Sequence, residues 1–288
     1  EQGAPDAPVL PVPESPAATA QIPASPQSAS PSDVSATIGE YSAARTTIRD
    51  ALIERHPLLL EVAVGGHDYI PALFPALEWL AEENTDGRRL AIACSHQQGA
   101  RYLIDTILPR LQTMLNCQLP VAYLAEHGGY LCTHRWFGAA MRRTSGELTA
   151  EQARGLAKLR LWTHQTFTGE RGELTLLQQE TSAWERISSG FEQTASKNSR
   201  FGTSYQRCTY RRKGYCFVSL AEERVNAARI VVTTHAGLFD DLSGSHSLLS
   251  SIGHRLILDA DLLEEENARW GSEEFDQMRL FRLLNTIG

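Results

Sequence analysis

The residues that could bind a phosphate lie in one turn. Gly65 and Gly66 follow the apolar run 58–64 and precede a second apolar stretch with helical spacing. Backbone N–H groups at such a turn can cradle phosphate oxygens, provided that a Lys bridges the outer phosphates and a Ser or Thr holds Mg²⁺. Here Asp68 takes the Lys position and Tyr69 takes the Ser position. The spacing indicates a phosphate loop whose chemistry has been lost.

Asp68 reverses the electrostatics of that loop. A carboxylate that faces a polyphosphate repels it, at a cost on the order of several kcal/mol in a partly desolvated loop. We therefore do not expect ATP to bind in the usual way. An ordinary turn in an unrelated α/β protein would explain the same residues, so other stretches must decide.

The elements that would position this turn alternate between strand and helix. A Pro/Ala/Ser-rich linker, expected to be disordered, occupies residues 1–38. The predicted elements that follow are a helix over 40–55, a buried strand over 58–64, a helix with Pro71 in its first turn, a strand over 89–94, a helix over 98–115 and a strand over 119–124. This alternation predicts an α/β fold with a parallel sheet and helices on both faces.

A polar segment interrupts the pattern. Residues 126–217 form a predicted insertion, mostly helical, with helices over 149–167 and 174–186. Strands are expected again over 228–234 and 256–259, and a last helix over 273–284. The two parts of the α/β domain are then 39–125 and 218–288.

The net charge, the apolar runs and the cysteine count limit the partners and the cellular compartment that we expect for this protein. The chain has 288 residues and a net charge of −7, which argues against a wholly basic nucleic-acid coat but permits a local basic patch. It contains no apolar run long enough to cross a bilayer, so we expect no membrane partner. Five widely spaced cysteines fit a reducing compartment, and a cytoplasmic location is expected. Because the chain begins with Glu1, we expect it to be part of a longer polypeptide.

Five stretches, in this order, resemble the first motor domain of the DinG/XPD-type superfamily-two DNA helicases, which carry an iron–sulfur insertion. They are 61–80, 90–111, Glu126-His-Gly-Gly-Tyr-Leu-Cys132, Cys208 to Cys216 with the strand to Ala236 that follows, and Leu256-Ile-Leu-Asp259-Ala-Asp-Leu-Leu263. The resemblance implies a RecA-like sheet of the P-loop NTPase type. It also implies ATP and Mg²⁺ as cofactors, single-stranded DNA as a partner, an upstream module, and a second lobe that this chain does not contain.

The departures from the family concern its ATP site. Asp259 lies where the Asp-Glu-Ala-His box has its metal-binding acid, but Ala260 replaces the Glu that activates water. Arg45 stands where the adenine-reading motif has a Gln. With Asp68 and Tyr69, four parts of one site are altered together, so we expect that ATP is not hydrolysed.

The resemblance also assigns cysteines. Cys132, Cys208 and Cys216 match three of the four thiolates of the family's iron–sulfur cluster, and a fourth is missing near position 203. His134 could complete a three-Cys, one-His zinc site instead. Buried thiols that bind nothing remain the third interpretation.

A basic segment lies beside these cysteines. It contains Arg200, Arg207, Arg211, Arg212 and Lys213, with Tyr210 among its aromatic residues. Cations that neutralise phosphates next to rings that stack on bases are typical of a single-strand groove. A solvated loop with core aromatics is the competing interpretation.

Three functions stay open at this point. The first is a helicase-like, nucleic-acid-binding motor domain that has lost ATP hydrolysis. The second is a fragment of an active ATP-dependent DNA helicase, and the third is a non-catalytic protein-interaction scaffold. Whether the nucleic acid would be DNA or RNA, and with which polarity, does not follow from the sequence.

Overall fold

The computed structural model describes seven stretches of the chain, namely residues 42–61, 69–82, 87–126, 128–141, 150–189, 208–243 and 247–271. The linker predicted for residues 1–38 and the helix predicted over 273–284 lie outside them. No helix within these stretches is both long and apolar enough to cross a bilayer.

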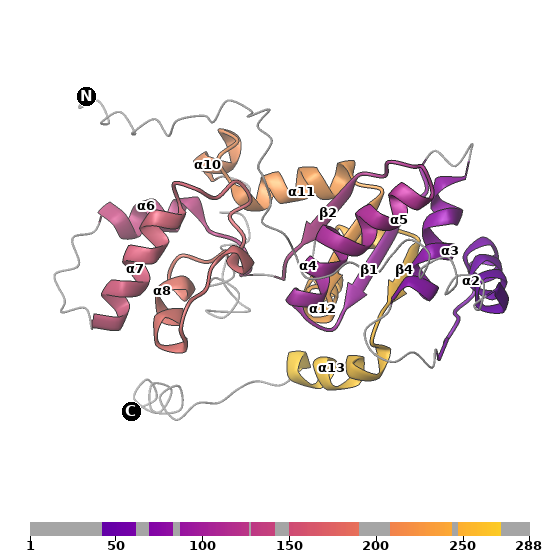
Figure 1. Cartoon of the computed structure of the whole chain (residues 1–288). Coiled ribbons are helices and arrows are strands. Elements are labelled where there is room, and N and C mark those ends of the chain that lie inside the picture. The colour runs from indigo at the N-terminus through magenta and orange to yellow at the C-terminus, as the bar shows by residue number, and fades with distance from the viewer. Residues whose placement is uncertain are drawn as a thin grey trace. The chain divides into compact units, whose positions relative to one another are not determined.

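A parallel sheet forms the centre of the α/β domain (Figure 1). Its strands, in spatial order, are β2 (Val121–Leu124), β3 (Ile230–Thr234), β1 (Leu90–Cys94) and β4 (His254–Ile257). Every neighbouring pair is parallel, with Leu90 beside both Ile230 and His254. Strands β1 and β3 are buried along their whole length, as expected for a sheet covered on both faces. The predicted α/β class and parallel sheet are thus confirmed.

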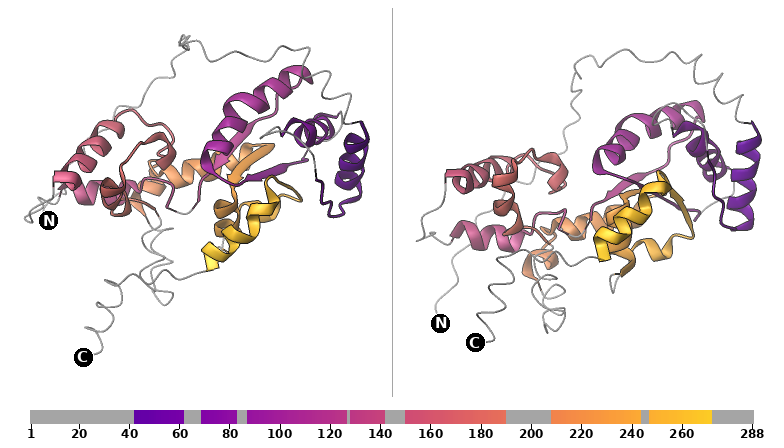
Figure 2. Two further views of the ribbon diagram at one scale, coloured as in Figure 1. Left: turned by 60° about the horizontal axis from the view of Figure 1, so that its bottom comes forward. Right: turned by 90° about the horizontal axis from the view of Figure 1, so that it is seen from below.

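Helices cover the two faces of this sheet (Figure 2). On one side, α4 (Gln97–Tyr102), a π-helical turn (Leu103–Ile107) and α5 (Leu108–Met114) follow each other without a break. On the other side lie α12 (His235–Ser243) and α13 (Leu263–Gly271). The core on the α12 side is made by Ala91, Ala93, Ala122, Leu124, Val225, Ala228, Val231, Leu238, Leu249 and Ile252.

Two helices flank the β4 edge. Helix α2 (Ser42–Glu54) packs against α3 (Ile70–Ala81), whose apolar residues are buried on most of its circumference. Pro71 lies in the first turn of α3, where its missing N–H costs little. The His254 Nε2–H donates to the Leu52 carbonyl (3.1 Å) and thereby ties α2 to β4.

The described residues between β2 and β3 are mostly helical. Their elements are α6 (Thr133–Met141), α7 (Ala150–Trp162), two 3₁₀ turns (Arg171–Glu173 and Gln178–Glu180), α8 (Thr181–Glu185) and α10 (Thr209–Arg212). Leu131, Leu159, Trp162, Ala183, Trp184 and Ile187 give this segment a core of its own. Helix α11 (Phe217–Ala227) then leads back to β3. We call the described part of this segment, residues 128–141, 150–189 and 208–216, the insertion.

One predicted strand is wrong in its described part. Residues 58–61 of the predicted strand 58–64 have no strand conformation, and Leu59 is 88% exposed. Its remaining residues, 62–64, lie outside the described stretches. Apolar residues alone do not make a strand without a neighbour that pairs with their backbone groups. Two 3₁₀ turns (Leu249–Ser251 and Ala260–Leu262) complete the described elements.

Candidate functional site

Tyr69 and Asp259 meet at the end of the sheet. Tyr69 precedes α3 and is 8% exposed, while Asp259 follows β4 in a left-handed conformation (φ 50°) that Asp tolerates. The Tyr69 hydroxyl lies 3.1 and 3.2 Å from the two carboxylate oxygens of Asp259. Of the predicted phosphate-loop residues, Tyr69 alone is described, since Gly65, Gly66 and Asp68 lie outside the described stretches.

A second hydroxyl reaches the same carboxylate. Ser95, directly after β1, donates from Oγ to Oδ2 of Asp259 (2.7 Å). The Ser95 Oγ also lies 2.8 Å from Nδ1 of His96. Because the single hydroxyl proton goes to the carboxylate, Nδ1 of His96 carries the proton and donates to Oγ. The result is a chain of hydrogen bonds from His96 through Ser95 to Asp259.

These contacts keep the neighbouring acidic groups protonated. Burial, together with the negative charge of Asp259, raises the pKa of the Tyr69 phenol, so Tyr69 remains a donor. The same two causes raise the pKa of the buried Cys94 thiol to about 12. Its Sγ donates to the Thr233 carbonyl (3.4 Å). Asp259 is therefore the one acceptor among three protonated neighbours.

The side chains described around Asp259 are not arranged as ligands of a magnesium ion. Mg²⁺ requires near-octahedral oxygen ligands at about 2.0–2.1 Å, and the oxygens of Asp259 already accept bonds from Tyr69 and Ser95. Within the described stretches, no group of three His, Cys, Asp or Glu side chains is placed to hold a metal ion. Ala260 offers no carboxylate beside it.

Arg45 is also engaged inside the protein. Its guanidinium pairs with Glu78 of α3 through two hydrogen bonds, one of them 2.8 Å long, and lies 5.8 Å from the centre of the Phe74 ring. The Glu78 carboxylate raises the pKa of Arg45. This side chain joins α2 to α3, a role that the sequence did not suggest.

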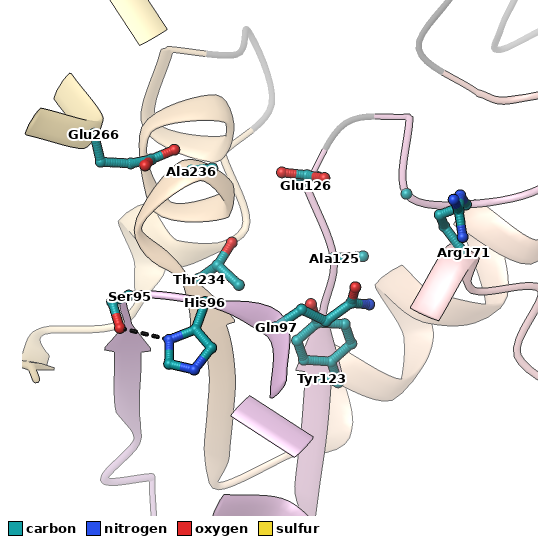
Figure 3. Close-up of a pocket in the computed structure, with 11 residues that line it drawn as sticks. Ser95, His96, Gln97, Tyr123, Ala125, Glu126, Arg171, Thr234, Ala236 and Glu266 are labelled. Carbon is teal, nitrogen blue, oxygen red and sulfur yellow. Dashed lines mark hydrogen bonds between the residues drawn. The ribbon is translucent and has the colours of Figure 1, made fainter. Parts of the chain in front are cut away.

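A pocket of about 250 Å³ opens at the carboxyl ends of β1, β2 and β3 (Figure 3). This edge is where ligands bind in open α/β sheets. Its lining is mostly polar and consists of Ser95, His96, Gln97, Tyr123, Ala125, Glu126, Gly129, Arg171, Thr234, Ala236 and Glu266. Arg171 comes from the insertion, so two parts of the chain build this pocket together.

The wall from the insertion is held by close contacts with α4. Arg101 pairs with Glu170, which is 2% exposed, and stacks over the Tyr123 ring at 4.8 Å. Gly172 lies against the side-chain amide of Gln97, so near that a Cβ at position 172 would overlap it. The position of Arg171 relative to the sheet is thereby fixed.

The three cysteines predicted as ligands lie in one region of the insertion. Thr133 Oγ1 donates to the Tyr215 carbonyl (2.7 Å), which brings the neighbours of Cys132 and Cys216 together. Burial is the main cause that raises the pKa of both thiols. The described cysteines and His134 do not form a three-ligand metal group. Within the described stretches these side chains are therefore not placed as the ligands of an iron–sulfur cluster or of a zinc ion.

The predicted nucleic-acid residues are described in part. Arg212 and Lys213 are exposed at the end of α10, whereas Arg211 pairs with Glu222 (2.6 Å). Tyr210 stacks on Phe137, with ring centres 5.5 Å apart, so one of its faces is covered. Arg200 and Arg207 lie outside the described stretches.

None of the pocket residues was assigned to this pocket from the sequence, although Glu126 and Gly129 lie in one of the five motif-like stretches. His235, directly after β3, is fully buried, and its Nε2–H donates to the Leu258 carbonyl (2.8 Å), so it is a packing residue. Ser95 and Gln97 lie within the stretch 90–111, for which the sequence predicted only a strand and a helix. The signal that could have found them is their position directly after a buried parallel strand.

A scan against models of known protein families finds no match to this chain, and a search of curated proteins finds no significant match either.

Proposed function

We propose that this chain is a helicase-related motor domain that binds nucleic acid and has lost ATP hydrolysis. The order of its five motif-like stretches supports the relationship, and the parallel α/β sheet is compatible with a RecA-like core. One observation carries the loss of hydrolysis, namely the Tyr69 hydroxyl hydrogen-bonded to Asp259.

The physical argument concerns the acid at the end of β4. In an ATPase this carboxylate serves a metal ion that bridges the phosphates. Here a phenol and the Ser95 hydroxyl occupy its oxygens, and a bulky ring stands where a small hydroxyl side chain would hold Mg²⁺. Tyr69 thus closes the site from within, and the ion pair of Arg45 with Glu78 removes the polar group that would face adenine.

Calorimetry with ATP and Mg²⁺ tests the loss directly. We expect neither binding nor turnover in the natural protein. A triple variant, Asp68→Lys, Tyr69→Ser and Ala260→Glu, restores the attractive charge, the small hydroxyl and the second acid, and we expect it to regain nucleotide binding. Saturable Mg²⁺-dependent ATP binding by the natural protein would overturn the proposal and favour the active-helicase fragment.

The nucleic-acid part rests on the exposed cations of α10. Fluorescence anisotropy with a short single strand should show binding that weakens when Arg212 and Lys213 are both replaced by Ala, and that falls with added salt. Replacing Arg160 and Arg186 by Ala, two exposed cations of the insertion, is the charge-matched control. Equal loss in both double variants would show a nonspecific charge effect and would contradict a groove at α10.

Exposed apolar side chains favour a second candidate function. Leu161, Phe167 and Leu177 of the insertion are 71%, 66% and 54% exposed. Large apolar groups in contact with water are a feature of protein-interaction surfaces. A chain that binds no single strand at low salt would therefore be assigned to the scaffold function.

A further inference from the structure

The pocket at the carboxyl edge is flanked by two opposite charges. Arg171 lies on the side of the insertion, and Glu126 lies at the end of β2 (Figure 3). Their side chains form no ion pair with each other, and neither pairs with another charged residue within the described part of the chain. Arg101, by contrast, is paired with Glu170.

Arg171 is held in place before any ligand arrives. Its backbone N–H donates to the Gly129 carbonyl (2.7 Å), and its Nη1 donates to the Leu174 carbonyl (2.9 Å). The guanidinium also lies 5.8 Å from the centre of the Trp184 ring. Partial burial lowers the pKa of Arg171. An anionic group in the pocket would supply the missing partner.

The rim of the pocket at Glu126 is negatively charged, in contrast to the side of Arg171. Two further carboxylates, Asp240 and Glu266, lie close enough for their negative charges to raise the pKa of Glu126 in addition to the effect of partial burial. A cationic group placed beside Glu126 would be stabilised by the negative charge of its carboxylate. A polyphosphate chain would be repelled by the same charges, so this rim does not suit the backbone of a nucleic acid.

The remaining lining supplies neutral hydrogen-bonding groups. The side chains of Gln97, Thr234 and His96 offer donors and acceptors between the two charged ends. The volume of about 250 Å³ lies just below the range of about 300–1,000 Å³ that drug-sized ligands occupy. A compact polar molecule fits such a space better than an extended one.

We propose that this pocket binds a small zwitterion of the amino-acid type, with its carboxylate on Arg171 and its ammonium group on Glu126. The proposal goes beyond the proposed function and does not depend on it, because it concerns a different set of residues at the same sheet edge. It requires both unpaired charges, since an anion alone would leave Glu126 without a partner.

Calorimetry with the natural protein tests the assignment. The probes are the standard L-amino acids, followed by the N-acetyl and carboxamide derivatives of any that binds, and inorganic phosphate as an anion alone. We expect at least one amino acid to bind with one-to-one stoichiometry. Blocking either charged end should weaken binding about tenfold or more, the loss expected for one charge-assisted hydrogen bond. Inorganic phosphate should bind more weakly than the amino acid.

Two variants assign the binding to the pocket. Arg171→Ala and Glu126→Gln should each weaken binding about tenfold or more, and Arg171→Lys should weaken it less than Arg171→Ala because the charge remains. Arg160→Ala and Glu185→Gln, exposed residues of the insertion, are the matched controls and should bind as the natural protein does. If Arg171→Ala does not fold, the exposed Glu126 variant still decides.

Three results would overturn the proposal. One is the absence of saturable binding by any amino acid. Another is binding that both Arg171→Ala and Glu126→Gln leave unchanged. The third is displacement of the amino acid by a short single strand whose own binding needs Arg171 but not Glu126, which would assign the pocket to nucleic acid.

Discussion

Two polar sites lie at the same edge of one sheet, and they differ in how their charges are satisfied. At the first, Asp259 accepts hydrogen bonds from Tyr69 and Ser95, so its oxygens already have partners within the protein. At the second, Arg171 and Glu126 face a pocket without a charged partner in the described structure. The position at a carboxyl edge is common to both, so position alone does not make a binding site.

This difference in bonding partners indicates which of the two sites can gain most from binding a ligand. A carboxylate whose oxygens already accept two protein donors gains little from a ligand, because each new contact replaces an existing one. A cation taken partly out of water without a carboxylate gains a full charge-assisted bond. By this criterion Asp259 has little left to offer a ligand, whereas the charges of Arg171 and Glu126 are available to one.

Breaking the ion pair between Arg101 and Glu170, behind the pocket, should cause the largest change in the free energy of unfolding. Arg101→Ala leaves Glu170, 3% exposed in its side chain, as an unpaired buried charge, and the free energy of unfolding should fall by about 3–5 kcal/mol. Urea unfolding followed by tryptophan fluorescence measures it, because Trp162 and Trp184 lie in the core of the insertion.

The double variant Arg101→Ala/Glu170→Gln is the control for that experiment. Removing both charges should recover much of the lost stability, because the penalty comes from the uncompensated carboxylate. Arg160→Ala, at an exposed position of α7, should change the unfolding free energy little. Stability of Arg101→Ala equal to that of the natural protein would contradict the fixed pocket wall.

A change at the site around Asp259 should lower the free energy of unfolding by a smaller amount. Tyr69→Phe removes the hydroxyl that contacts Asp259 but keeps the ring, and we expect the unfolding free energy to fall by about 1–2 kcal/mol. Tyr102→Phe is the matched control, since Tyr102 is 49% exposed and makes no described hydrogen bond from its hydroxyl. An unaltered midpoint for Tyr69→Phe would mean that the Tyr69–Asp259 contact does not hold the site closed.

Ser95 separates the two sites, because it lines the pocket but donates its proton to Asp259. Ser95→Ala should therefore lower the unfolding free energy by about 1 kcal/mol and weaken amino-acid binding far less than Arg171→Ala does. Calorimetry and urea unfolding on the same preparation measure the two effects. A loss of affinity comparable with that of Arg171→Ala would show that the sites are not independent.

The sequence predicted the sheet well because buried parallel strands carry a strong signal. Strands β1 and β3 are nearly continuous apolar runs, and the helix after β1 begins at Gln97, one residue before the predicted start. The run 58–61 was misread because pairing with a neighbouring strand, and not apolarity, decides whether a strand forms.

The sites were predicted unevenly for a related reason. The motif alignment found Tyr69 and Asp259 separately, but their hydrogen bond depends on a separation of 190 residues that no local pattern records. Arg171 and Glu126 form a pocket only because contacts between the insertion and α4 place them there. From sequence one can therefore predict which residues lie at a sheet edge, but not which of their polar groups already have hydrogen-bond or ion-pair partners.

The smallest predicted effect is the contribution of Glu126 to the pH dependence of the free energy of unfolding. Partial burial and the charges of Asp240 and Glu266 raise the pKa of Glu126 above its ordinary value of about 4.3. The folded state thus binds this proton more tightly than the unfolded state, and the natural protein loses stability as pH rises through the raised pKa. Glu126→Gln has no carboxylate at this position and so does not lose this stability. The difference in unfolding free energy between Glu126→Gln and the natural protein should therefore shift in favour of the variant from acid toward neutral pH. We expect this shift to stay below about 1 kcal/mol because solvent screens the exposed group. Urea unfolding across this range measures it, and a difference that does not change with pH would contradict the like-charge rim on which ammonium binding depends.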